Sequence, residues 1–215
     1  MGNGPSLCGG STNNVAPPLP LPSTPSGVVR DKVRVIFLGD QASGKTSLFR
    51  PASGSPAVHA PYPSWETRTE TRTVDGAPIK LELLDTAGQE RFDALPPIYY
   101  NSAQVCVLVT DLARPTTLLR SGSWLAEFDE RAPGGTVVLV GNKADLLGGE
   151  ELGRATAALE NMAASFRTNS ERTVRALVVS TKAQGNAALA GSVDALYSLI
   201  AQQAAAKLSK ARAAQ

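Results

Sequence analysis

The segment Gly39-Asp-Gln-Ala-Ser-Gly-Lys-Thr46, GDQASGKT in one-letter code, fits the phosphate-loop pattern G-x-x-x-x-G-K-[ST]. An apolar run over residues 33–38 precedes it and predicts a strand, and a helix is expected over 44–50. In this context the glycines let backbone N–H groups turn inward around phosphate oxygens, and the helix N-terminus adds partial positive charge. The segment therefore predicts a phosphate cradle. The alternative, a chance glycine-rich turn, is disfavoured by the flanking strand and helix.

The side chains of this cradle have distinct expected roles. Lys45 would reach the terminal phosphates of a nucleotide, and the Thr46 hydroxyl would ligate Mg²⁺. The other expected phosphate-binding residues are Gly39, Asp40, Gln41, Ala42, Ser43 and Gly44.

The chain as a whole suits one globular domain. Its 215 residues suffice for a domain of ordinary size with tails, and a hydrophobic content of 42% suffices for a core. The formal net charge of +2 gives no global field that would favour nucleic acid. Two cysteines cannot make a disulfide framework, and Cys106 lies in an apolar run where a buried thiol is expected. Neither a membrane span, which needs roughly 18 apolar residues, nor a secretory signal is predicted.

Composition divides the chain into three predicted regions. Residues 1–30 are rich in Gly, Ser, Asn and Pro, which predicts a disordered arm; residues 31–205 form the expected globular domain and 206–215 a short basic tail. The expected strands are 33–38, 80–84, 105–110, 136–140 and 174–179, and the expected helices are 44–50, 116–131, 150–166 and 187–210. Because strands and helices alternate, an α/β fold is predicted, with a mostly parallel sheet and helices on both faces.

A second motif, Asp85-Thr-Ala-Gly-Gln-Glu90, follows the strand that ends at Leu84. An Asp at a strand end can hold Mg²⁺ through a water, which is the role expected of Asp85. Gly88 leaves room for its N–H to approach a terminal phosphate, and Gln89 could orient an attacking water. Taken alone, the motif is equally compatible with a polar surface loop.

A third motif, Asn142-Lys-Ala-Asp145, follows the strand expected over 136–140. The Asp145 carboxylate can accept two hydrogen bonds from the N1–H and the exocyclic amino group of guanine, a donor pair that adenine lacks. Because an unpaired buried carboxylate is costly, the motif favours guanine over adenine. Asn142 and the stem of Lys143 are expected to brace the loop and cover the base.

Together, GDQASGKT, DTAGQE, NKAD and Ser180-Thr-Lys182 resemble the nucleotide motifs of Ras-superfamily small GTPases, in the family's order and spacing, over residues 32–205. Residues 89–100, QERFDALPPIYY, resemble the second switch of the Rab branch, and residues 141–146, GNKADL, its base loop. Ala42 and the Tyr-Tyr-x-x-Ala-Gln pattern resemble the corresponding residues of the early-endosomal Rab subgroup. The resemblance implies a P-loop NTPase G domain with a six-stranded sheet. It also implies binding of GTP and GDP with Mg²⁺ as cofactor, and GTP hydrolysis with Lys45 and Gln89 as catalytic residues.

The resemblance implies further roles for individual residues. Ser180-Thr181-Lys182 replaces the family's usual Ser-Ala-Lys, and its backbone would contact the guanine oxygen. The first switch of the family contains a threonine that senses Mg²⁺ and the terminal phosphate, and Ser64 falls at that position. Thr67 and Thr69 are the fallback candidates, and a merely solvated Ser64 is the alternative.

Three departures from the family bear on function. The long side chain of Gln41 can displace the attacking water or obstruct an arginine from an activating protein, which predicts slow hydrolysis; the alternative is that it points into solvent. Prolines at positions 51, 56, 61 and 63 predict an irregular first switch and an early end to the helix before it. Because segment 66–73 is wholly polar, neither of its faces is expected to pack well against a core. This predicts an altered effector set, an edge strand whose charges deter aggregation, or both.

The N-terminal sequence Met1-Gly-Asn-Gly-Pro-Ser6 fits the myristoylation pattern at Gly2, and Cys8 is placed for palmitoylation. One myristoyl chain binds membranes only marginally, so a second acyl chain is expected for stable anchoring. The last residues contain no cysteine for prenylation, a feature that resembles the N-myristoylated, plant-type endosomal Rabs. The alternative is an unmodified soluble arm.

These features predict a monomeric, Rab-like molecular switch in vesicle or endosomal membrane traffic. Its expected protein partners are effectors, an exchange factor and a GTPase-activating protein, and no nucleic acid is expected. It is expected on the cytoplasmic face of endosomes or other endomembranes, or at the plasma membrane, and in the cytosol when unacylated. Two alternatives stay open: a GTP-binding scaffold with little hydrolysis, and an adaptor that acts through its Pro-rich arm.

Overall fold

The structure is a computed structural model of the chain. It describes residues 32–50, 58–59, 66–86, 97–168, 172–182, 189 and 191–213, with the backbone alone at 58–59. All of these residues belong to the unit that spans 31–215.

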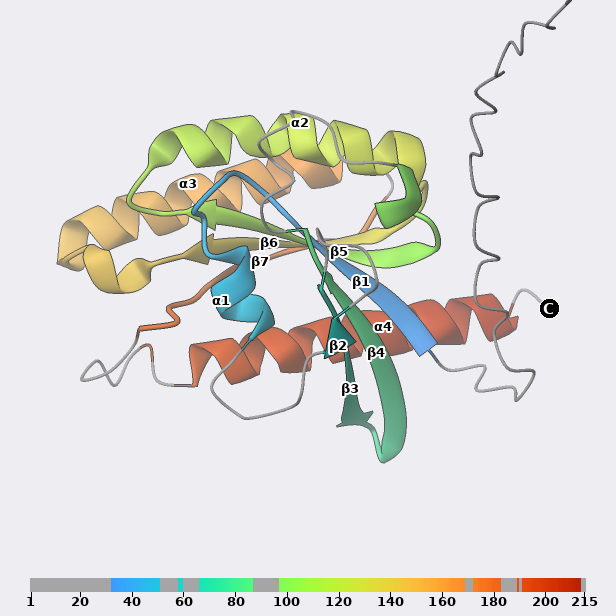
Figure 1. The fold of residues 1–215 in the computed structure, drawn as a ribbon. Coiled ribbons are helices and arrows are strands. Elements are labelled where there is room, and N and C mark those ends of the chain that lie inside the picture. Colours follow the sequence, from blue (N-terminus) through green and yellow to red (C-terminus); the bar gives the residue numbers. More distant parts are fainter. Residues whose placement is uncertain are drawn as a thin grey trace, which may run out of the picture. The chain divides into compact units, whose positions relative to one another are not determined.

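A seven-stranded sheet forms the centre of the described residues (Figure 1). The strands are β1 (Lys32–Leu38), β2 (Val58–His59), β3 (Glu66–Val74), β4 (Ala77–Asp85), β5 (Ala103–Asp111), β6 (Thr136–Asn142) and β7 (Val174–Val178). Their spatial order is β2-β3-β4-β1-β5-β6-β7. Parallel pairing links β4, β1, β5, β6 and β7, whereas β3 pairs antiparallel with β4, and β2 with β3. The predicted six-stranded, mostly parallel sheet is confirmed, with the two-residue β2 added at one edge.

The α-helices of the described residues are α1 (Lys45–Phe49), α2 (Pro115–Arg131), α3 (Gly149–Thr168) and α4 (Ser192–Ala213). Short 3-10 turns occur at η2 (Pro97–Tyr99) and η3 (Ala144–Leu146). As expected, α1 ends before Pro51, which can neither donate a helical hydrogen bond nor continue the helix. Helix α4 continues past the expected end near residue 210 and through most of the segment 206–215 that was predicted as a tail. None of these helices combines the length and the apolar character that crossing a bilayer requires.

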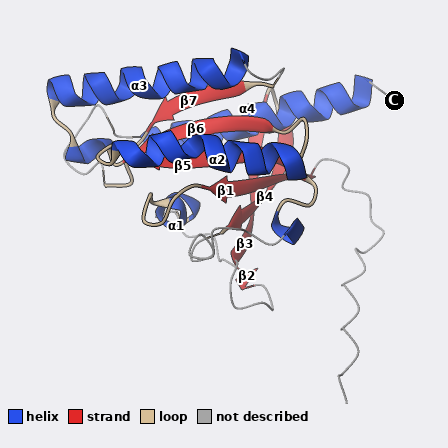
Figure 2. Cartoon of the chain, turned by 90° about the horizontal axis from the view of Figure 1, so that it is seen from above, coloured by secondary structure: helices blue, strands red, loops and turns tan. Residues whose placement is uncertain are grey.

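The helices cover both faces of the sheet, because successive strand residues point to opposite sides. In β1, Val33, Val35 and Phe37 belong to a buried cluster that includes residues of α1 and α4, whereas Ile36 and Leu38 belong to a second cluster with α2 and α3. Figure 2 shows the same division, with α2 and α3 on one side of the sheet and α4 on the other. Strands that are apolar on both faces therefore lie in the middle of three layers, as the sequence predicted.

The polar strand β3 packs against α4 through contacts between arginine and tyrosine. Arg68 is 3% exposed; its guanidinium carbon lies 5.5 Å from the ring centroid of Tyr197, and its Nη2 donates to the Tyr197 hydroxyl at 2.9 Å. Arg72 lies over the same ring at 5.3 Å, and Glu70 pairs with both arginines. The expectation that neither face of this segment packs well was wrong, because planar guanidinium groups can stack on an aromatic ring while a carboxylate neutralises them. The opposite face carries exposed threonines at positions 69, 71 and 73.

Candidate functional site

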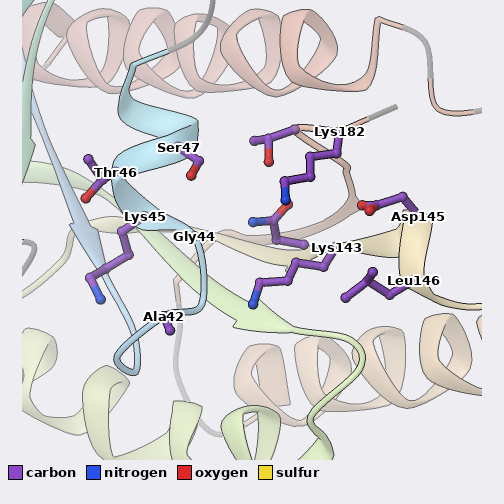
Figure 3. A pocket seen from close by; sticks show the side chains of 11 residues that line it. Ala42, Gly44, Lys45, Thr46, Ser47, Lys143, Asp145, Leu146 and Lys182 are labelled. Carbon is purple, nitrogen blue, oxygen red and sulfur yellow. The ribbon is translucent and has the colours of Figure 1, made fainter. Parts of the chain in front are cut away.

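A pocket of about 420 Å³ opens at the edge of the sheet where the parallel strands end (Figure 3). Loops that follow neighbouring parallel strands meet at this edge, which is where ligands bind in open α/β sheets. The lining residues are Ala42, Gly44, Lys45, Thr46, Ser47, Asn142, Lys143, Asp145, Leu146, Thr181 and Lys182. The pocket thus brings together the phosphate-loop motif, the NKAD motif and the segment 180–182.

The loop between β1 and α1 wraps around the ammonium group of Lys45. Lys45 is buried, and its Nζ donates to the carbonyl oxygens of Gly39 and Asp40, each at 2.9 Å. Gly39 has a φ of 133°, and a Cβ at this residue would lie 2.1 Å from the carbonyl oxygen of Val109 in β5. Only glycine fits here, because both the backbone conformation and the close approach of β5 exclude a side chain. The loop therefore holds a cation at its centre, as a phosphate cradle requires.

Gly44 and Asn142 join the phosphate-loop motif to the NKAD motif. Asn142 is 1% exposed, and its Nδ2 donates to the carbonyl oxygen of Ser43 at 3.0 Å. Gly44 has a φ of 102°, and a Cβ there would lie 2.1 Å from the same Nδ2. Asn142 Oδ1 and Ser43 Oγ are buried without a hydrogen-bond partner among the described residues. One amide group thus ties the two loops together, in the bracing position expected of Asn142.

Thr46 and Asp85 form an oxygen pair beside this loop. The Thr46 hydroxyl donates to Asp85 Oδ2 at 2.7 Å, and Asp85 is buried at the end of β4. Mg²⁺ takes oxygen ligands and is usually held by one or two protein groups together with waters and substrate phosphates. Within the described ranges, no group of three or more His, Cys, Asp or Glu side chains could hold a metal ion. The pair therefore fits Mg²⁺ that also binds the phosphates of a nucleotide.

Asp145 lines the pocket at a distance along the sheet edge from Lys45 (Figure 3). The Ser180 hydroxyl donates to Asp145 Oδ1, and the backbone N–H of Lys182 donates to Ser180 Oγ at 3.0 Å. The backbone N–H of Ser180 in turn donates to the hydroxyl of Ser192, the first residue of α4, at 3.2 Å. Ser180 therefore orients the Asp145 carboxylate, a contact that the sequence did not predict.

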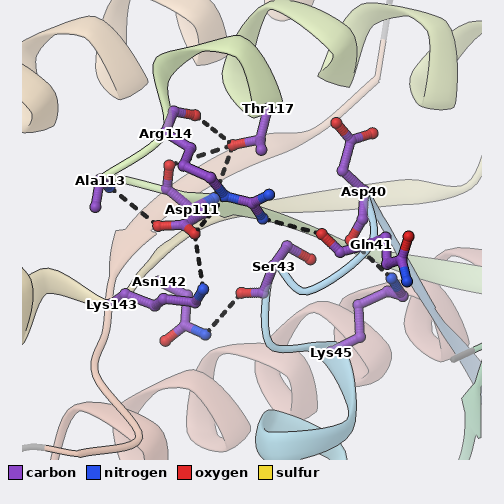
Figure 4. Close-up of polar contacts among 10 residues, drawn as sticks. All are labelled: Asp40, Gln41, Ser43, Lys45, Asp111, Ala113, Arg114, Thr117, Asn142 and Lys143. Atoms are coloured by element: carbon purple, nitrogen blue, oxygen red, sulfur yellow. Dashed lines mark hydrogen bonds and ion pairs between the residues drawn. The ribbon is translucent and has the colours of Figure 1, made fainter.

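A network of charged side chains that the sequence analysis missed links the phosphate loop to the NKAD loop (Figure 4). Buried Asp111, the last residue of β5, accepts hydrogen bonds from Lys143 Nζ at 2.7 Å and from Arg114 Nε at 2.8 Å. Arg114 also donates to the carbonyl oxygen of Gln41 at 2.9 Å. Burial favours a higher pKa for Asp111, but the hydrogen bonds from Lys143 and Arg114 outweigh it and hold the pKa below its usual value. The available signal was the position of Asp111 at the carboxyl end of a predicted strand, the edge where the motifs converge.

Helix α2 also holds the second residue of the phosphate-loop motif. Trp124 Nε1 donates to Asp40 Oδ1 at 2.8 Å, and Arg120 Nε lies 3.5 Å from the same oxygen. Gln41 is exposed and does not line the pocket. The protein thus fixes the backbone carbonyl of Gln41 through Arg114, while the side chain takes the solvent-facing placement that was the alternative to obstruction.

Five predicted site residues lie outside the described residues and stay predictions: Gly2, Cys8, Ser64, Gly88 and Gln89. The fallback residues for Ser64 are described. Thr67 and Thr69 lie in β3, and neither lines the pocket.

The mostly parallel sheet, with a phosphate-loop motif between β1 and α1 and an NKAD motif after β6, defines a G domain of the Ras type. The sequence profile of the Ras family matches residues 34–184, and the chain belongs to this family.

Several relatives are similar to this chain. GTP-binding protein ypt5 of Schizosaccharomyces pombe is 34% identical over 137 residues, in an alignment that covers 58% of this chain and 61% of the relative. Rab-like protein 2A of Mus musculus is 37% identical over 123 residues, 54% and 52% of the two chains. GTP-binding protein YPT53 of Saccharomyces cerevisiae is 36% identical over 128 residues, 55% and 56%. The chain thus spans 52–61% of the length of these curated relatives.

Proposed function

We propose that this protein is a Rab-like GTPase that binds GTP and GDP with Mg²⁺ and changes state when GTP is hydrolysed. The observation that carries the proposal is the meeting of three groups at one pocket: the Lys45 cation, the Thr46 hydroxyl, which is hydrogen-bonded to Asp85, and the Asp145 carboxylate. These groups suit, in turn, phosphates, a magnesium ion and a base with adjacent N–H donors. Membership of the Ras family and similarity to two relatives named as GTP-binding proteins support it.

The NKAD loop and the segment that follows β7 would select the guanine base. Asp145 would accept hydrogen bonds from the N1–H and the amino group of guanine, and Ser180 keeps its carboxylate oriented. The stem of Lys143 would cover the base while Asp111 holds its ammonium group. Thr181 and Lys182 line the same part of the pocket, where the backbone would meet the guanine oxygen.

The phosphate loop and the two switch segments would bind the phosphates and support hydrolysis. Lys45 and the loop N–H groups would neutralise the phosphates, and Thr46 together with Asp85 through a water would hold Mg²⁺. When bound, Mg²⁺ neutralises charge on the terminal phosphates. Ser64 and Gly88 are proposed to sense the terminal phosphate and Gln89 to orient the attacking water, so that hydrolysis releases both switch segments.

We place this switch in vesicle or endosomal membrane traffic, because residues 89–100 resemble the second switch of the Rab branch. Residues 1–30 would act as an arm acylated at Gly2 and Cys8 that anchors the G domain to a membrane. Intact-mass measurement of the chain co-expressed with an N-myristoyltransferase tests the first acylation. An unmodified N-terminus would instead favour the soluble arm.

The guanine site is tested with the full chain and two variants. Purified protein is denatured, released nucleotide is identified by chromatography, and GDP and ADP are then compared as ligands. We expect bound guanine nucleotide, and a loss of GDP affinity of at least about a hundredfold in Asp145→Ala, because two hydrogen bonds to a charged acceptor disappear. Glu150→Gln removes a carboxylate that is 89% exposed and serves as the control. Failure to load guanine nucleotide, or equal binding of ADP, would contradict the proposal.

A single turnover of loaded GTP separates the switch from the scaffold alternative. Measurable hydrolysis that Gln89→Leu abolishes supports a cycling GTPase. GTP that persists in the wild-type protein with Mg²⁺ would favour a GTP-binding scaffold that is controlled by loading and abundance.

A further inference from the structure

A second polar pocket, of about 330 Å³, lies at the opposite edge of the sheet from the candidate nucleotide site, where β6 and β7 begin. The length of β6 separates the two edges by roughly 20 Å. The lining residues are Gly134, Thr136, Arg172, Thr173, Gln203, Ala206, Lys207 and Lys210. The four lining residues of α4 recur at helical spacing, so one face of the helix forms a wall of this pocket.

Three cationic side chains line this pocket, and the first of them, Arg172, is largely buried. The Arg172 side chain is 8% exposed, and its guanidinium carbon lies 5.5 Å from the ring centroid of Phe128. Its Nη2 lies 2.5 Å from Asp129 Oδ1, which fixes its orientation. Nε and Nη1 are buried and have no hydrogen-bond partner among the described residues. Because buried N–H groups are normally satisfied, these two nitrogens can donate hydrogen bonds to a ligand's oxygens after a small shift.

The other two cations come from α4. Lys207 is half-buried and its Nζ donates to the carbonyl oxygen of Gly134. Burial first, and then the like charges of Lys210 and Arg172, lower the pKa of Lys207, so both of the other cations repel Lys207. Within the described part of the chain, no carboxylate pairs with Lys207 or Lys210. Asp129 pairs with Arg172 and not with either lysine, so among the described residues the positive charges at this pocket exceed the negative ones.

We propose that this pocket binds a phosphate group, with Arg172, Lys207 and Lys210 as its ligands. A phosphate dianion would relieve the repulsion among the cations and satisfy the unpaired guanidinium donors, which match the geometry of phosphate oxygens. The pocket is larger than one phosphate needs and falls at the lower end of small-molecule sites. Thr136, Thr173 and Gln203 add neutral hydrogen-bonding groups that suit the hydroxyls of a polyol attached to the phosphate. The ligand class is thus a phosphorylated polyol, either soluble or as the headgroup of a lipid.

The proposal is independent of GTP binding, because it uses different residues at the other edge of the sheet. The full chain, loaded with GDP and Mg²⁺, is titrated by calorimetry with inorganic phosphate and with an inositol bisphosphate at physiological salt. It is then floated with phosphatidylcholine vesicles that contain or lack a phosphoinositide. The variants are Lys207→Gln and Lys207→Gln/Lys210→Gln. The control, Lys80→Gln/Arg154→Gln, removes the same number of charges elsewhere. Retained GDP binding shows that each variant is folded.

We expect saturable binding of the phosphorylated polyol, weakened roughly tenfold by Lys207→Gln and further by the double variant, with the control unchanged. Binding of the soluble compound assigns a soluble ligand, and binding only to vesicles that carry the phosphoinositide assigns a lipid headgroup. The proposal is overturned if neither form binds, or if the double variant and its control bind equally well.

Discussion

The contact between Gly44 and Asn142 gives a sharp test of how the two nucleotide loops are joined. Gly44→Ala would place a Cβ 2.1 Å from Asn142 Nδ2, and its φ of 102° is one that L-residues rarely adopt. The backbone conformation alone costs about 1–3 kcal/mol. The amide must also move, which breaks its hydrogen bond to the buried Ser43 carbonyl and costs about 1–3 kcal/mol more. The free energy of unfolding should therefore fall by about 2–6 kcal/mol in total.

Asn142→Ala separates the two parts of this cost. Alone, it removes the hydrogen bond to Ser43 and should cost about 1–3 kcal/mol. In that background Gly44→Ala should cost only the backbone strain, because the nearest atoms to its Cβ all belong to the Asn142 side chain. The double variant is then less destabilised than the sum of the single variants by about 1–3 kcal/mol.

Urea unfolding followed by circular dichroism measures these differences at one fixed concentration of GDP and Mg²⁺. Each value is corrected for nucleotide affinity, because a ligand that binds the folded state adds stability by mass action. Gly153→Ala is the matched control: it lies inside α3, its Cβ would meet nothing within 4 Å, and its φ is not in the positive range. It should stabilise the helix by about 0.5–1 kcal/mol. Additivity of the two site substitutions within about 0.5 kcal/mol would refute the steric reasoning.

Three further changes have defined expected outcomes. Tyr197→Phe removes the hydroxyl that donates to the Leu48 carbonyl at 2.8 Å and accepts from buried Arg68, so it should lower the unfolding free energy by about 1–3 kcal/mol in urea titrations; an unchanged midpoint would show that Arg68 finds another partner. The folded-state pKa of Asp111 is depressed, so its stabilisation is present above the unfolded pKa of about 3.9 and is lost as the pH falls through the folded value. The stability gap between wild type and Asp111→Asn should therefore shrink as the pH falls below about 3.9, and a constant gap in that range would exclude the network as its cause. Gln41→Ser should leave the rate of a single turnover of GTP unchanged, because the Gln41 side chain is exposed and does not line the pocket; a faster turnover in the variant would show that the long side chain obstructs the attacking water when nucleotide is bound.

Local patterns were enough to predict the layered fold and most of the pocket. Strand β1 is apolar at consecutive positions, so it had to be covered on both faces. The glycines and Lys45 of the segment after it follow a pattern that is typical of phosphate binding in this position. The NKAD motif follows another strand of the same kind. Because parallel strands end at one edge, these motifs were expected to meet, and the described residues place Lys45 and Asp145 in the same pocket. Ser64, Gly88 and Gln89 stay predictions, since they lie outside the described residues.

The order of the layers and the positions of the motifs could therefore be predicted from local patterns, because both depend on the spacing of residues close together in the chain. The pairing of side chains that are distant in the sequence, through hydrogen bonds and ion pairs, became visible in the folded structure. Arg68 is buried because Tyr197, far along the chain, supplies a ring and a hydroxyl, and buried Asp111 pairs with Lys143, which comes from the loop after β6. The energy of such contacts depends on burial and on approach within hydrogen-bond distance, and neither quantity is carried by a local pattern.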